Sequence, residues 1–180
     1  MAHSQDTHSH EADPACAVAH GEAAAPATDR TLVAVFASPV AGHLLRYAAD
    51  LGYRGILLEP DAARAASVGT AAFEVVTTPP GDLDRTVDVV VTDHHRPELG
   101  TVLGDLLARD CRWIGVLGNP RHPAPHVAAL AGLGVPAEDI ARVHRPIGLN
   151  IGSRTPPEIA IATLAGLLAD RNGRPGGFAF

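Results

Sequence analysis

The stretch PIGLNIGSRTPPEIAIATLAGLL, residues 146–168, contains the best-marked helix start in the chain. Thr155 stands where an N-cap residue belongs, Pro156 follows at the first helical position, and Glu158 comes three residues after the cap. This order is that of a capping box, in which the cap residue and the glutamate each bind the other's backbone N–H. The stretch therefore predicts a helix that begins at Pro156.

The loop before this helix carries polar groups close to a helix N-terminus. Gly148 and Gly152 flank Asn150, so the backbone can turn tightly and can approach another surface. Arg154 lies immediately before the N-cap, and a helix N-terminus attracts anions. Two interpretations stay open: a loop that only leads into a core helix, and a loop that binds an anion.

Upstream of this loop, short apolar runs alternate with helical segments. The helices are expected over residues 39–51, 97–110 and 124–133. The expected strands are TLVAVFA (31–37), GILLEP (55–60), FEVVTT (73–78), VDVVVTD (87–93) and WIGVLGN (113–119). Such alternation predicts one α/β domain, residues 30–173, with a doubly wound parallel sheet between two helix layers.

Composition narrows the class of protein. The 180 residues are 46% hydrophobic with a net charge of −6, and no Lys occurs, so all 14 basic residues are Arg. No basic stripe favours nucleic acid, and no apolar run approaches the roughly 20 residues that cross a membrane. Two cysteines, Cys16 and Cys111, provide no disulfide framework, and no signal peptide pattern is evident. These features predict a cytoplasmic protein.

The two ends of the chain read differently from the domain. Residues 1–29 have almost no large apolar side chains and predict a disordered, dispensable tail. A second flexible tail is expected over residues 174–180. The histidines of the first tail and Cys16 match no closed zinc spacing, so we predict no metal site; these histidines are His3, His8, His10 and His20.

Ligands of open parallel sheets bind beyond the carboxyl ends of the strands. The loops at that edge are residues 37–41, Glu59, residues 93–96 and residues 118–122, and the loop at 146–155 is expected to close over them. Cys111 precedes the fifth strand, so it belongs at the opposite edge as a buried thiol.

Each candidate residue in these loops has two interpretations. Ser38 and Glu59 stand where a dinucleotide loop and a ribose-binding acid belong, but the first loop lacks the glycines that tight NAD(P) binding needs. Asp93 and His94 suit acid–base catalysis, or Asp93 caps its own turn. Arg121 suits phosphate oxygens, as Arg154 does, or both are surface residues.

The run PIGLNIGSRTPPEIA resembles the C-terminal signature of the XdhC/CoxI family, accessory proteins of xanthine and carbon monoxide dehydrogenases. YRGILLEP, VVVTDHH and WIGVLGNPRH extend the resemblance over roughly residues 32–171. The family usually has Asp at Asn150 and Glu at Pro157. A family Gly-Ser-Arg-Arg segment corresponds here to Gly118, Asn119, Pro120 and Arg121, of which the second and third differ.

The resemblance implies the Rossmann-like part of a maturation factor for a molybdenum hydroxylase. Such a factor binds the molybdenum cofactor, assists its sulfuration and delivers it to the apo-enzyme. The cofactor carries a phosphate, which the resemblance would place near Gly118, Asn119, Arg121, Gly148, Asn150, Gly152 and Arg154. The resemblance does not include the family's N-terminal cysteine domain, so a separate subunit of that type or a cysteine desulfurase is an expected partner. The alternatives are a small NAD(P)-linked oxidoreductase and a regulatory nucleotide-binding module.

The helix after Thr155 is apolar nearly all round. Ile159, Leu164 and Leu167 form one stripe, whereas Ile161 and Leu168 belong to another. A helix of this kind is buried on both sides. The sheet can cover one side and a second copy of the chain can cover the other, so we predict a homodimer.

Overall fold

The computed structural model describes residues 14–24, 28–68, 73–119 and 121–177. Those parts of the chain form six strands and seven helices. In chain order they are α1 (Pro14–Ala19), β1 (Arg30–Val35), α2 (Pro39–Asp50), β2 (Tyr53–Leu58), α3 (Ala62–Ser67), β3 (Glu74–Val76), β4 (Val87–Val91), α4 (Leu99–Leu107), β5 (Trp113–Val116), α5 (Pro125–Gly132), α6 (Ala137–Ile140), β6 (Val143–His144) and α7 (Pro156–Arg171).

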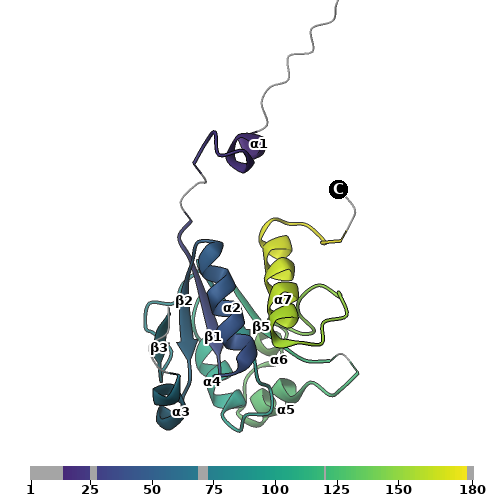
Figure 1. The fold of residues 1–180 in the computed structure, drawn as a ribbon. Coiled ribbons are helices and arrows are strands. Elements are labelled where there is room, and N and C mark those ends of the chain that lie inside the picture. The colour runs from purple at the N-terminus through teal and green to yellow at the C-terminus, as the bar shows by residue number, and fades with distance from the viewer. Residues whose placement is uncertain (1–13, 25–27, 69–72, 120, 178–180) are drawn as a thin grey trace, which may run out of the picture.

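All six strands join one parallel sheet in the order β3-β2-β1-β4-β5-β6. The direction of winding reverses between β1 and β4, which is the switch point of a doubly wound fold. Figure 1 shows the sheet with α2 and α7 side by side over one face. The predicted fold class, an α/β Rossmann-like domain with a parallel sheet, is confirmed.

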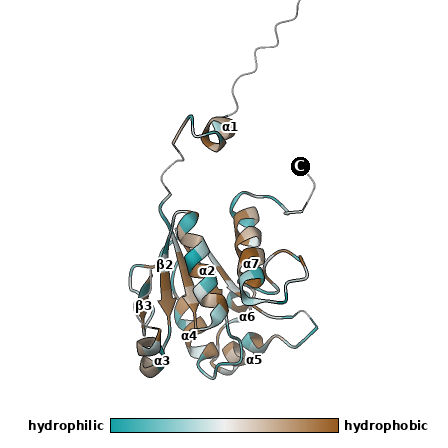
Figure 2. Cartoon of the chain, viewed as in Figure 1, coloured by the Kyte–Doolittle hydropathy of each residue, from teal (hydrophilic) through white to brown (hydrophobic). Residues whose placement is uncertain are grey.

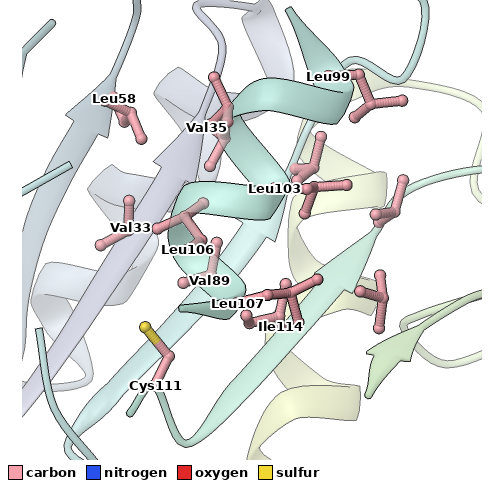
Figure 3. Packing of buried hydrophobic residues seen from close by; sticks show 14 of the residues in the cluster. Val33, Val35, Leu58, Val89, Leu99, Leu103, Leu106, Leu107, Cys111 and Ile114 are labelled. Carbon is pink, nitrogen blue, oxygen red and sulfur yellow. The ribbon is translucent and has the colours of Figure 1, made fainter. Parts of the chain in front are cut away.

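Alternate strand residues point to opposite faces and build two cores. One core places Val33, Val35 and Val89 against α4, whose Leu99 and Leu103 face them (Figure 3). The other core packs α2 and α7 against the opposite face of the same strands. Both faces are covered, which explains why the second half of β2, residues 56–58, is hydrophobic (Figure 2). The helix predicted over residues 97–110 is confirmed as α4, whose apolar residues Leu99, Val102, Leu103, Leu106 and Leu107 are buried.

Three short elements differ from the expectation. Helix α1 lies inside the segment predicted to be a disordered tail, where Pro14 at the helix start and three alanines favour helix, although none of its residues is buried. Helix α3 begins after Asp61, whose carboxylate accepts two backbone N–H groups. Strand β6 has only two residues, too few for an alternating pattern to show in the sequence.

The capping box at the start of α7 is confirmed. The Glu158 carboxylate accepts the backbone N–H of Thr155 at 3.2 Å and that of Arg154 at 2.7 Å. These bonds hold the pKa of Glu158 below its usual value. They fix the point at which the loop turns into the helix.

The other end of α7 is anchored to the sheet by a buried carboxylate. Asp88, in β4, has no exposed surface and accepts Arg112 Nε and Arg171 Nε, each at 2.6 Å. Arg112 also binds Asp170 at 2.7 Å, and Tyr53 donates to Asp88 at 3.4 Å. This cluster joins α7, β4 and the residue before β5, so it sets where α7 lies on the sheet.

Cys111 is buried in the α4-side core, as predicted. Burial raises the pKa of its thiol to about 11. The thiol therefore stays protonated at neutral pH and is a poor nucleophile.

Candidate functional site

At the switch point of the sheet, the hydroxyl groups of Ser38 and Thr92 link the end of β1 to the end of β4. Ser38 donates to Thr92 Oγ1 at 2.9 Å, and the Thr92 hydroxyl lies 3.0 Å from the Val35 carbonyl and 2.9 Å from that of Phe36. Ser38 Oγ also accepts the Ala41 N–H, which caps α2. The predicted site residue Ser38 therefore connects the start of α2 to the end of β4.

Glu59 and Arg96 form a buried, two-pronged ion pair beside this switch point. Arg96 Nη1 donates to Glu59 Oε2 at 3.0 Å, and Nη2 donates to Oε1 at 2.8 Å. The backbone N–H groups of Ala37 and Asp61 donate to the same carboxylate at 2.8 and 3.0 Å. Arg96 also lies over the ring of Phe36, 4.7 Å from its centroid.

These contacts also determine the pKa of Glu59. Burial by itself would raise the pKa of Glu59, but the bonds from Arg96 and from the Ala37 and Asp61 amides outweigh it and lower the pKa. The carboxylate has no exposed surface and four donors, so it has no room for a ribose hydroxyl. Glu59 instead holds together the loops after β1, β2 and β4 in this structure, and its predicted role in cofactor binding stays untested.

Asp93, His94 and His95 follow β4 at the same edge. Asp93 Oδ1 accepts the His95 N–H at 3.0 Å, which is the local turn that the sequence left open as one interpretation. The His94 ring lies 4.1 Å from that of His95. Burial, His95 and Arg145 lower the pKa of His94, so its ring is neutral at pH 7. A neutral imidazole there can accept or donate one proton, and the acid–base role of Asp93 and His94 stays a prediction.

The loop after β5 positions an arginine that the sequence did not single out. Arg145 Nη2 donates to the Asn119 carbonyl at 3.0 Å, and Nη1 donates to that of His122 at 3.2 Å. A Cβ at Gly118 would lie 2.5 Å from Arg145 Nε, so a larger residue there would displace the guanidinium. Asn119 Oδ1 in turn accepts the Arg121 N–H at 2.9 Å.

The loop at residues 146–155 lies along α7. Leu149 donates its N–H to the Ala162 carbonyl at 2.9 Å. Gly148, with φ of +85°, packs so closely that an added Cβ would lie 3.1 Å from the backbone at Ala162. The loop was expected to close over the strand ends, whereas Gly148 and Leu149 instead contact the middle of α7.

The start of α7 has few donors left for an external anion. Pro156 and Pro157 have no N–H, the Glu158 N–H belongs to the capping box, and that of Ile159 bonds to the Thr155 carbonyl. The anion interpretation therefore depends on side chains and not on the helix start. Asn150 and Gly152 are exposed, and their role in cofactor binding stays a prediction.

Two predicted arginines present free guanidinium groups. In the described parts of the chain, the side chains of Arg121 and Arg154 bond to no acceptor, and both residues are exposed. The ion pair of the buried Arg96 and the packing of the half-buried Arg145 were missed, because such contacts depend on which loops the fold brings together. The only nearby residue that the sequence did single out is Asn119, whose carbonyl accepts a hydrogen bond from Arg145.

Strand order and switch-point loops together define a Rossmann-like domain. The family described as the XdhC Rossmann domain matches residues 32–167, and the chain belongs to this family. A curated relative, the uncharacterized protein YqeB of Escherichia coli strain K12, is 43% identical over 75 residues, which are 42% of this chain and 14% of that protein. The resemblance drawn from the signature at residues 146–160 is thereby confirmed.

A solved structure shares the fold. The crystal structure of a xanthine dehydrogenase from Bacillus halodurans matches with a TM-score of 0.62 at 22% identity, over 80% of this chain and 45% of that chain. The chain thus spans less than half the length of either protein that it matches here.

The described residues form neither a membrane-spanning helix nor a cluster of metal ligands. Their helices include none that is long and apolar enough to cross a membrane. Within the same residues no three His, Cys, Asp or Glu side chains gather as metal ligands. His3, His8 and His10 lie outside the residues that the structure describes.

Proposed function

We propose that this chain is an accessory factor in the maturation of a molybdenum hydroxylase of the xanthine or carbon monoxide dehydrogenase type. It binds the molybdenum cofactor and assists its sulfuration or its insertion into the apo-enzyme. Membership of the XdhC family is the observation that carries this proposal. The chain's own part is to bind and orient, as no described cysteine is both exposed and placed in the domain.

The side chains at the carboxyl edge suit the phosphate of such a cofactor. Arg121 and Arg154 keep unpaired guanidinium groups on exposed loops, in the part of the chain that the structure describes. Guanidinium forks match phosphate oxygens. Neutral His94 and the exposed Asn150 amide can exchange hydrogen bonds with a pterin ring. The bound cofactor would supply the molybdenum centre that the target enzyme uses.

Sulfur transfer needs a partner in this proposal. Cys111 is buried with a raised pKa, and Cys16 belongs to the short helix α1 outside the domain. A persulfide carrier must present an accessible thiolate. A subunit of the N-terminal XdhC type or a cysteine desulfurase would therefore deliver the sulfur, and the molybdenum hydroxylase apo-enzyme would receive the cofactor.

Replacing Arg121 or Arg154 with Ala is expected to weaken retention of the molybdenum cofactor by about tenfold to a hundredfold. Each charge-assisted bond is worth roughly 1.5–3 kcal/mol, and 1.4 kcal/mol is a factor of about ten. The measurement is the cofactor that co-elutes with the chain in gel filtration. The melting temperature of each variant is recorded in parallel and should stay unchanged, since both side chains are exposed.

Arg174→Ala is the matched control, because Arg174 is also exposed and lies beyond the far end of α7. If the Arg121→Ala, Arg154→Ala double variant retained the cofactor fully, these two arginines would not be its phosphate ligands. The strand order favours the alternative of an NAD(P)-linked enzyme, so NADP is a second ligand in the same assay. Strong NADP retention would favour that alternative, which the occupied Glu59 carboxylate opposes.

We also propose that the chain forms a homodimer through α7 and its preceding loop. Ile161 on α7 and Ile151 on the loop are each more than half exposed. Burying two such side chains against a second copy is favourable. Light scattering at micromolar concentration is expected to give twice the chain mass, and Ile161→Glu to give the monomer mass. A monomer for the unchanged chain would disprove this proposal.

A further inference from the structure

A groove opens at the outer edge of the sheet, between α5, α6 and β6. Its volume is about 480 Å³. Seven of its nine lining residues are apolar and the other two are His126 and Arg145; the apolar residues are Ala124, Val127, Ala131, Ala137, Ile140, Ala141 and Val143. Apolar walls with few convergent polar groups are typical of small-molecule sites.

His126 is a buried polar group that nothing in the fold explains. It is 3% exposed, and its Nδ1 atom has no hydrogen-bond partner among the described residues. Burial, Arg145 and His94 lower its pKa, so the ring is neutral. A buried polar atom without a partner costs free energy, and such atoms are therefore rare unless a ligand or water binds them.

Arg145 provides the charge at this groove. Two of its five N–H groups donate to the carbonyls of Asn119 and His122, and its Nε lacks a partner in the described residues. These two carbonyls hold the guanidinium in place, so little side-chain entropy remains to be lost on binding. No acidic side chain lines the groove. The lining of the groove therefore carries one positive charge and is otherwise apolar apart from His126.

We propose that this groove binds a small organic carboxylate, with the anionic group on Arg145 and His126 and the apolar body on α5 and α6. The groove adjoins the proposed cofactor loop after β5, because the Asn119 and His122 carbonyls hold Arg145. The proposal nevertheless does not depend on the proposed function. A carboxylate suits Arg145 because a guanidinium donates two parallel bonds to two oxygens. The neutral His126 ring can donate a further bond without repelling the guanidinium.

Benzoate is the probe, and its neutral isostere benzamide and inorganic phosphate are the comparisons. Titrations of the full chain are followed by the backbone amide signals in proton–nitrogen correlation NMR. We expect benzoate to shift signals of α5, α6 and β6 and to bind at least about tenfold more tightly than benzamide, because only benzoate pairs with Arg145. We expect phosphate to bind at least about tenfold more weakly than benzoate, since it leaves the apolar walls uncovered.

Ala131→Leu tests the location without removing a polar group. Ala131 is an exposed groove residue on α5, so leucine there fills the groove and should abolish benzoate binding while the fold is kept. Ala128→Leu, an exposed position of the same helix outside the groove, should leave binding unchanged. The proposal fails if benzoate does not bind, if Ala131→Leu still binds it, or if benzamide or phosphate binds as tightly.

Discussion

Replacing Asp88 with Ala is expected to lower the free energy of unfolding by about 3–5 kcal/mol, because it leaves the mostly buried Arg171 without a charge partner and Arg112 with Asp170 alone. Asp88 has no exposed surface and accepts Arg112 and Arg171 at 2.6 Å each. Without the carboxylate, the Arg171 guanidinium loses its charge partner, and α7 loses its ion pair with β4. Urea denaturation followed by circular dichroism measures the change.

The control for Asp88 is an exposed ion pair at the same edge of the sheet. Asp110 binds Arg85 at 2.8 Å, but both side chains are mostly exposed. Asp110→Ala should therefore cost less than about 1 kcal/mol. If Asp88→Ala does not fold, Asp88→Asn, which keeps the shape and removes the charge, replaces it in the comparison. A cost for Asp88→Asn as small as that for Asp110→Ala would contradict the assigned role.

The same contrast shows what the sequence can and cannot predict. Local signals such as the capping box at Glu158 and the apolar face of α4 were predictable, because their partners lie within one turn of helix. Asp88 reads as one polar residue in an apolar strand, and its partner Arg171 lies 83 residues away. Nothing in the local pattern pairs residues at that separation.

Some features of the candidate site were likewise predictable from the sequence, and others were not. The loops at the carboxyl edge followed from the order of strands and helices, and Ser38 lies where the sequence placed it. The roles of its charged groups did not follow, because a carboxylate at the end of a strand can face a ligand or a buried arginine. Glu59 faces Arg96, 37 residues away, and only the fold shows this. Arg145 was missed for the same reason.

Replacing Glu59 with Gln is expected to cost about 3–5 kcal/mol of stability at pH 7, since it leaves Arg96 buried with only the half-exposed Glu98 as a charge partner. The double variant Glu59→Gln, Arg96→Met should recover much of this loss, because it leaves no buried cation in need of a charge partner. Urea denaturation of the three variants, with Arg96→Met alone as the third, gives the coupling between the two positions.

The pH dependence of stability gives an independent test of Glu59. Its pKa in the folded state is lower than in the unfolded chain, so its contribution is fully present above the unfolded value of about 4.3 and is lost as the pH falls through the folded value. Acidification from pH 7 into this range should therefore destabilise the unchanged protein more than Glu59→Gln, which has no proton to gain there. Equal losses in the two proteins, measured by urea denaturation at each pH, would show that Glu59 is not the stabilising carboxylate of this loop cluster.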